Sequence, residues 1–275
     1  MMRFFCRLLV VCIVVTGGTA LAQRPGGYGL GNAGFGGGGA LHAGIRLRSY
    51  RFEATGEPVQ YGVFVPRKLD KTQPVPLVIA LHGAGGSPES ILNPLATAAE
   101  KHHFIVAAPM GYAATGWYGF VRRMAGPAER ETSRLSEIDV MNVLAMMRAE
   151  FNIDPRRIYV LGASMGGVGA VHLAAKYPDL WAAIGVISPA ITANTPEEFL
   201  NYGTTPVVVA HGDHDPGVPV DLVRAWVAQL KEKKVPMLYY EYQGGTHISV
   251  VQQCGENVFA FLDRYSRPET PAAAQ

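Results

Sequence analysis

The chain has 275 residues, of which 48% are hydrophobic and 17% charged, so it contains enough apolar material for one large core. A formal net charge of only +2 excludes the strong positive excess that nucleic acids and anionic membranes attract. We therefore expect one domain of the α/β size range, with neither nucleic acid nor a membrane as a stable partner.

The first 22 residues have the pattern of a secretory signal peptide. Arg3 and Arg7 lie at the start of an apolar stretch, and Ala20-Leu21-Ala22 offers a small-residue cleavage site. An uncleaved anchor is the alternative, but the apolar run is shorter than the ~20 residues of a spanning helix. Cleavage leaves a formal net charge of zero and Cys254 as the one remaining thiol, so we expect an exported protein without an internal disulfide, in which Cys254 is buried and inert.

The composition predicts four segments. The signal peptide at 1–22 precedes a Gly-dominated flexible linker at 23–44, whose formal matches to a dinucleotide-binding Gly motif lack the required strand and helix. A folded domain follows at 45–266, and the Pro/Ala-rich tail at 267–275 is expected to be disordered.

Within the folded domain the hydrophobic pattern changes from paired strands to alternating strands and helices. The segments 47–52 and 59–65 alternate as an antiparallel pair, and 75–81 is a continuous apolar run. Further strands are predicted at 104–108, 157–161, 181–187, 206–210 and 237–242, and helices at 90–102, 136–151, 168–176, 220–233 and 247–265. This order predicts a mostly parallel twisted sheet with antiparallel N-terminal strands and helices on both faces.

One connection is longer than such a fold requires. About 24 residues separate Pro109 from Ser133, and they include Tyr112, Trp117 and Tyr118. Because the connection leaves the carboxyl end of its strand, these aromatic residues are candidates for the wall of a substrate pocket. The alternative is a surface loop whose aromatic side chains pack on the core.

A possible nucleophile lies where the strand at 157–161 meets a helix. Gly162-x-Ser164-x-Gly166 has the spacing of a nucleophile elbow, in which the serine side chain is forced outward at a tight turn. A Cβ at either glycine would collide with neighbouring backbone. The motif alone is weak evidence, but the strand and helix around it supply the expected context.

A serine hydroxyl needs a base and a group that orients the base. His247 follows the last strand in a Gly-rich turn on the same sheet edge as Ser164, although a capping or exposed histidine is the alternative. Asp215 lies in the loop after the preceding strand and is favoured over Asp213, which is more suited to capping the turn. The order Ser164, Asp215, His247 is the one expected of an α/β hydrolase.

A tetrahedral intermediate also needs two hydrogen-bond donors. We assign them to the backbone N–H groups of Met165, after the nucleophile, and of Ala84, in the loop after the strand at 75–81. His82 is interpreted as a brace for that loop. His211-x-x-His214 has no further ligand cluster near it, so no metal is predicted.

The sequence from about Tyr61 to Tyr265 resembles α/β-hydrolase-fold serine esterases, and among them the secreted polyhydroxybutyrate depolymerase, feruloyl esterase and esterase D-like group. The resemblance rests on PLVIALHGAGGS at 76–87, Ser136-Glu-Ile-Asp139, DPRRIYVLGASMGG at 154–167 and HGDHDPGVP at 211–219. It implies a carboxylic-ester hydrolase without a cofactor, acting on a small-molecule or carbohydrate-linked ester. A serine peptidase of the prolyl-oligopeptidase-like type and a non-catalytic binding protein on the same scaffold remain as alternatives.

Overall fold

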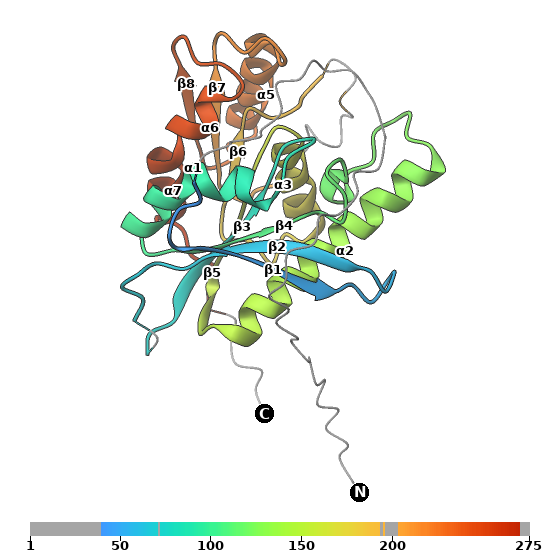
Figure 1. Cartoon of the computed structure of the whole chain (residues 1–275). Helices are drawn as coiled ribbons and strands as arrows, with labels where there is room; N and C mark the ends of the chain where they lie inside the picture. Colours follow the sequence, from blue (N-terminus) through green and yellow to red (C-terminus); the bar gives the residue numbers. More distant parts are fainter. Residues whose placement is uncertain (1–39, 71, 193–194, 196–202, 270–275) are drawn as a thin grey trace, which may run out of the picture.

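The computed structural model describes residues 40–70, 72–192, 195 and 203–269, so the expected signal peptide lies outside the described residues, as do most of the linker and most of the tail. The described chain forms an eight-stranded sheet in the order β1-β2-β4-β3-β5-β6-β7-β8 (Figure 1). Its strands are β1 (Ile45–Arg51), β2 (Pro58–Phe64), β3 (Val75–Leu81), β4 (Ile105–Pro109), β5 (Ile153–Ala163), β6 (Ile184–Ile187), β7 (Val207–Gly212) and β8 (Met237–Tyr242).

Only the first strands of the sheet are antiparallel. β1 pairs with β2 and β2 with β4 in antiparallel register, whereas every pair from β4 to β8 is parallel. Each residue of β3 is buried, as its unbroken apolar run predicts. The predicted α/β-hydrolase fold, with antiparallel strands followed by a mostly parallel sheet, is confirmed.

Helices cover both faces of the sheet (Figure 1). The side chains of α2 (Pro127–Glu150), α3 (Met165–Lys176) and α5 (Val220–Glu232) form one apolar cluster with one face of the strands. The side chains of α1 (Pro88–Lys101), α6 (Ser249–Gln253) and α7 (Gly255–Leu262) form a second cluster on the other face. Burial on both faces explains why β3, β4, β6 and β7 are buried throughout and almost wholly apolar.

Several predicted boundaries are wrong. The strand expected at 157–161 is the longer β5, because its pairing with β3 continues past a register shift to Val75 and Ile153. The helix expected at 136–151 begins at Pro127, since proline is favoured at the first position of a helix. The first two turns are polar and carry no apolar stripe, so the hydrophobic pattern did not indicate them. The strand expected at 181–187 begins at Ile184, since the buried Trp181 donates its indole N–H to the carbonyl of Leu173, 3.1 Å away. The helix expected at 247–265 is two helices, which meet at Cys254 and Gly255, where a poor helix former interrupts the pattern.

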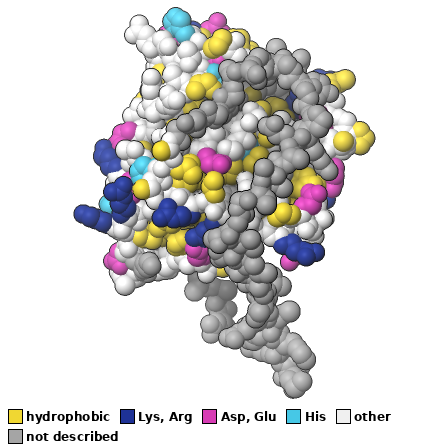
Figure 2. Space-filling model, in the orientation of Figure 1, with side chains coloured by type: hydrophobic (Ala, Val, Ile, Leu, Met, Phe, Trp, Pro, Cys, Tyr) yellow, Lys and Arg dark blue, Asp and Glu magenta, His cyan; other side chains and the backbone are white. Residues whose placement is uncertain are grey.

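No helix within the described residues has the length and apolar character needed to cross a membrane. On the face shown in Figure 2, positive and negative side chains of the described residues are interspersed with apolar ones. This distribution agrees with the low net charge of the sequence.

Candidate active site

The candidate nucleophile lies in a strained turn between β5 and α3. Ser164 has φ 56° and ψ −115°, a conformation that non-glycine residues rarely adopt and that persists only where surrounding contacts hold it. Its N–H donates to the carbonyl of Ile187 at 2.9 Å, and its own carbonyl accepts from the N–H of Ala190 at 3.1 Å. These bonds tie the turn to the end of β6 and to the segment that follows it, and Ser164 is only 8% exposed.

The two glycines of the motif are required by close backbone approach, as the sequence predicts. A Cβ on Gly162 would overlap the carbonyl group of Gly166 and lie 2.9 Å from its Cα. A Cβ on Gly166 would overlap the carbonyl oxygen of Leu81 and lie 2.8 Å from that of His82. The start of α3 therefore packs directly against the end of β3 and the loop that follows it.

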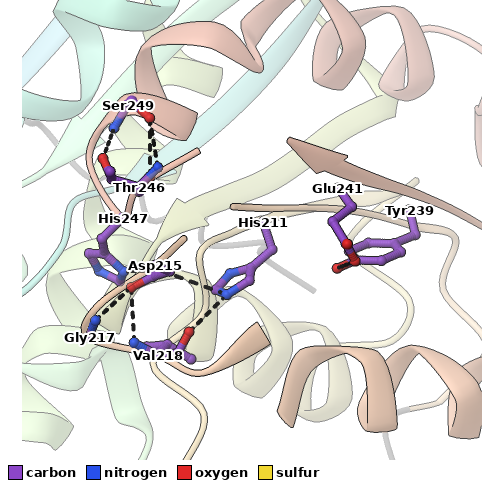
Figure 3. A network of polar contacts seen from close by, with 9 residues as sticks. All are labelled: His211, Asp215, Gly217, Val218, Tyr239, Glu241, Thr246, His247 and Ser249. Carbon is purple, nitrogen blue, oxygen red and sulfur yellow. Dashed lines mark hydrogen bonds and ion pairs between the residues drawn. The ribbon is translucent and has the colours of Figure 1, made fainter. Parts of the chain in front are cut away.

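The candidate acid and base contact each other (Figure 3). Asp215 Oδ2 lies 2.6 Å from His247 Nδ1, while Asp215 Oδ1 accepts from the N–H groups of Gly217 and Val218 at 2.8 and 2.9 Å. The turn that carries His247 is closed by Thr246 and Ser249, whose side chains each accept from the other residue's N–H. This geometry fixes the position and orientation of the imidazole.

Burial alone would raise the pKa of Asp215, but the hydrogen bonds from His247, Val218 and Gly217 outweigh it and lower that pKa below its usual value. The carboxylate is thus ionised at neutral pH. Beside it, burial lowers the pKa of His211, whose Nε2 lies 3.0 Å from the carbonyl oxygen of Val218. A neutral His211 donates to that carbonyl and holds the loop around the carboxylate (Figure 3).

Asp213, the other candidate acid, has different partners. Its Oδ1 accepts from the N–H of Gly244 at 2.6 Å and lies 2.7 Å from Nδ1 of the exposed His214. It therefore joins the turns after β7 and β8. Among the described residues no cluster of three or more His, Cys, Asp or Glu side chains could hold a metal ion.

The candidate oxyanion donors lie in the oxyanion loop, which we define as residues 81–87, and at the start of α3. Within the described part of the chain, the N–H groups of Ala84 and Met165 have no hydrogen-bond acceptor, and Ala84 is exposed. His82 is buried, with Nδ1 2.8 Å from the carbonyl oxygen of Gly83 and Nε2 2.9 Å from that of Met110. The predicted bracing position of His82 agrees with these contacts.

The three aromatic pocket candidates lie in different surroundings. The connection after β4 is shorter than expected, since α2 begins at Pro127, and it contains the short helix η1 (Trp117–Gly119). The ring of Tyr112 packs on that of Phe52, in the turn between β1 and β2. Trp117 is partly exposed, and the Arg122 guanidinium lies 5.3 Å from its ring centroid. Tyr118 has no exposed surface, so its ring belongs to the core and cannot touch a substrate at the surface.

The motif Ser136-Glu-Ile-Asp139 carries part of the family resemblance, but no role was predicted for its polar residues, which contact this connection from α2. Asp139 is fully buried and accepts from the N–H of Gly111 and of Tyr112 and from the hydroxyl of Tyr50. Ser136 accepts from the N–H of Tyr118. The signal for a structural role was the position of both residues on the apolar face of a helix, where an uncompensated polar side chain is costly.

One family model and several known proteins are similar to this chain. The model of a family described as "Putative esterase" matches residues 53–255. The chain is 30% identical over 152 residues to "Putative esterase NocK" of Nocardia uniformis subsp. tsuyamanensis, covering 53% of this chain and 42% of that protein. It is 31% identical over 125 residues to feruloyl esterase B of Neurospora crassa, covering 44% of this chain and 40% of that protein. The matches thus span less than half the length of these two relatives.

Among solved structures, the fold is similar to that of an S-formylglutathione hydrolase from Agrobacterium tumefaciens. The TM-score is 0.68 and the sequence identity 15%, with 80% of this chain and 94% of that chain covered. At this identity the likeness extends to the fold alone.

Proposed function

This chain belongs to the esterase family whose model it matches, and on that premise we propose that it hydrolyses carboxylic esters through a covalent acyl-enzyme on Ser164. Asp215 orients His247, and His247 is the general base and acid. The observation that carries the proposal is the 2.6 Å contact between Asp215 Oδ2 and His247 Nδ1, at the sheet edge where the strained turn presents Ser164.

In the first half of the reaction, the Ser164 Oγ–H proton passes to Nε2 of His247 as Oγ bonds to the ester carbonyl carbon. The carbonyl π electrons move onto the oxygen, which accepts hydrogen bonds from the N–H groups of Met165 and Ala84. When the tetrahedral intermediate collapses, the C–O bond to the alcohol breaks and His247 gives the alcohol its proton. Asp215 stabilises the imidazolium throughout and keeps its own charge.

In the second half, His247 takes a proton from water as the water oxygen attacks the acyl carbon. The same two N–H groups hold the second oxyanion, Ser164 leaves with the proton from His247, and the acid is released. All proton transfers use protein groups and water, so the reaction requires no cofactor.

Support for the substrate class comes from the relatives, one of which is named a feruloyl esterase. We propose a small or carbohydrate-linked ester, with Trp117 as the stronger pocket candidate because it is partly exposed and close to a cation. Tyr112 is the weaker one, since its ring faces the turn between β1 and β2. Tyr118 is fully buried, so it could affect the substrate only indirectly, through the residues that it contacts.

The test of the mechanism is labelling by a fluorophosphonate probe, read by peptide mass spectrometry. We expect the label on Ser164, no label in Ser164→Ala, and full labelling in Ser49→Ala, which removes an exposed serine of β1. Hydrolysis of p-nitrophenyl acetate that survives Ser164→Ala would rule the mechanism out. A panel of feruloyl esters, acetylated xylan and peptide anilides then separates esterase from peptidase activity.

We also propose export, because residues 1–22 have a signal-peptide pattern. Expression of the full sequence in a Gram-negative host, followed by fractionation, should give an extracytoplasmic protein that begins at Gln23. Recovery of the intact N-terminus in the cytoplasm would contradict this proposal.

A further inference from the structure

The proposed mechanism leaves unused a row of buried polar side chains on α2. Ser133, Ser136 and Asp139 are each no more than 1% exposed, and all three face the connection after β4. A buried carboxylate is costly unless its hydrogen bonds are made, so the partners of Asp139 indicate what it holds in place.

Asp139 and Ser136 anchor both ends of one segment, which we call the bridging segment and define as residues 110–118. Asp139 Oδ2 accepts from the N–H groups of Gly111 and Tyr112 at 2.7 and 3.0 Å, and its Oδ1 accepts from the Tyr50 hydroxyl at 2.7 Å. At the other end, Ser136 Oγ accepts from the N–H of Tyr118 at 3.1 Å. The segment is thus fixed to the helix at its beginning and its end.

The bridging segment in turn holds the oxyanion loop at three points. The carbonyl oxygen of Ala114 accepts from the N–H of Gly85 at 2.8 Å, directly after Ala84. The carbonyl oxygen of Met110 lies 2.9 Å from His82 Nε2, and the Tyr118 hydroxyl donates to the carbonyl of His82 at 3.2 Å. Every one of these contacts depends on the conformation of residues 110–118.

That conformation is not one the segment would adopt unaided. Tyr112, Trp117 and Tyr118 have φ values of 58°, 58° and 53°, in the left-handed region that bulky residues avoid. Such residues persist only where surrounding contacts hold them. Asp139 accepts from the N–H of Tyr112, the first of these three residues, so loss of the carboxylate would let the start of the bridging segment relax.

From these contacts we infer that Asp139 is a positioning residue, which sets the Ala84 N–H for the oxyanion through the bridging segment. The inference rests on the proposed function, because it assumes that Ala84 is an oxyanion donor. It gives the carboxylate a specific task, which is to accept three hydrogen bonds in fixed directions. Asparagine could retain this arrangement, with its oxygen facing the two N–H groups and its amide donating to the Tyr50 oxygen, whereas alanine could not.

The test compares an ester with its thiono analogue, in which sulfur replaces the carbonyl oxygen and accepts hydrogen bonds poorly. An enzyme with aligned oxyanion donors prefers the oxygen ester, so the ratio of the two kcat values reports on the donors. In Asp139→Ala we expect kcat for the oxygen ester to fall by roughly 10- to 100-fold, since one oxyanion donor accounts for about 10² to 10³. KM should change less than about twofold, and the preference for oxygen should fall nearly as far as kcat.

Asp139→Asn should restore both the rate and the preference to within about threefold of the wild type. The matched control is Glu150→Ala, which removes another carboxylate of α2 that bonds to β1, through Arg48, without contacting the bridging segment. Tyr118→Phe, which removes only the hydroxyl bond to the oxyanion loop, is the second variant if Asp139→Ala does not fold. It should lower the oxygen preference while the core remains filled.

An oxygen preference that stays at the wild-type level in Asp139→Ala, or in Tyr118→Phe where Asp139→Ala does not fold, would overturn the inference and leave the proposed function intact. Absence of any oxygen preference in the wild type, or hydrolysis that survives Ser164→Ala, would instead overturn the proposed function and this inference with it. The two failures are therefore distinguishable.

Discussion

The close packing of α3 against the oxyanion loop can be tested with two neighbouring glycines. A Cβ on Gly166 would lie 2.6 Å from the carbonyl carbon of Leu81 and 2.8 Å from the carbonyl oxygen of His82, whereas real Cβ atoms almost never come within 3.0 Å of another heavy atom. A Cβ on Gly167 would approach no neighbour closer than 3.3 Å. Both glycines lie in the first turn of the same helix, so the two Gly→Ala changes differ mainly in this contact.

In Gly166→Ala the helix and the oxyanion loop must separate by about 0.4 Å or more, because both sides of the contact are backbone. Overpacking of this kind costs about 1 to 3 kcal/mol, against which alanine recovers up to ~1 kcal/mol of helix propensity. Gly167→Ala gains nearly the same helix propensity and has little of the overpacking cost. We therefore expect the free energy of unfolding to be about 1 to 3 kcal/mol lower in Gly166→Ala than in Gly167→Ala, measured by urea denaturation.

Catalysis should be more sensitive than stability to this displacement. The moved backbone carries the Met165 N–H on one side and leads to the Ala84 N–H on the other, and a misplacement of about 1 Å can cost ~10² in rate. We expect kcat for p-nitrophenyl acetate to fall by roughly 10- to 100-fold in Gly166→Ala and by less than about threefold in Gly167→Ala. Equal stability and equal kcat in the two variants would refute the argument that the tight approach of α3 is what demands glycine at 166.

Three further outcomes are expected. Asp215→Asn should lower kcat by roughly 10⁴, which is the loss known for the same change in a trypsin-type triad. The control Asp213→Asn should change kcat by less than about threefold. Comparable losses of kcat in both variants would contradict the assignment of Asp215 as the acid. Burial would raise the pKa of Glu137, but hydrogen bonds from His172, Lys176 and Tyr177 lower it to about 2, so its stabilising contribution is full above about pH 4.5 and is lost as pH falls through 2. Glu137→Gln should therefore reduce the free energy of unfolding at pH 7, and the difference from the wild type should shrink between pH 4.5 and 2; a constant difference would exclude this cause. Because burial raises the pKa of the Cys254 thiol to about 12, iodoacetamide should modify the Cys254 peptide only after denaturation, and rapid modification of the folded protein would contradict its burial.

The sequence predicts the parallel half of the fold well because each buried strand has a local signature. β3 and β7 are short apolar runs between turn residues, and both are buried throughout. The motif around Ser164 also has local causes, since Gly162 and Gly166 are required by contacts that recur wherever a strand turns tightly into a helix.

The first two turns of α2 could not be found in the same way. Residues 127–134 are almost entirely polar, so no apolar stripe marks them as helical. Their stabilisation comes from Pro127 at the first helical position and from surface pairs such as Arg122 with Glu129, whose side-chain N and O atoms lie 2.6 Å apart. Neither the proline nor the ion pair identifies a helix in the sequence alone, because both also occur outside helices.

The buried polar contacts of Asp139 illustrate a deeper limit. Hydrophobic periodicity places Asp139 on the inner face of α2, among Val140, Val143 and Met147. There it is a charged residue at a position where the pattern predicts an apolar one. Its partners come from β1, 89 residues earlier, and from the connection after β4, 27 and 28 residues earlier. No local pattern contains that combination, because it exists only once the sheet order has brought the three segments together. An unexplained polar residue on an apolar helix face is therefore the sequence signal that should direct attention to a second layer of residues behind a proposed active site.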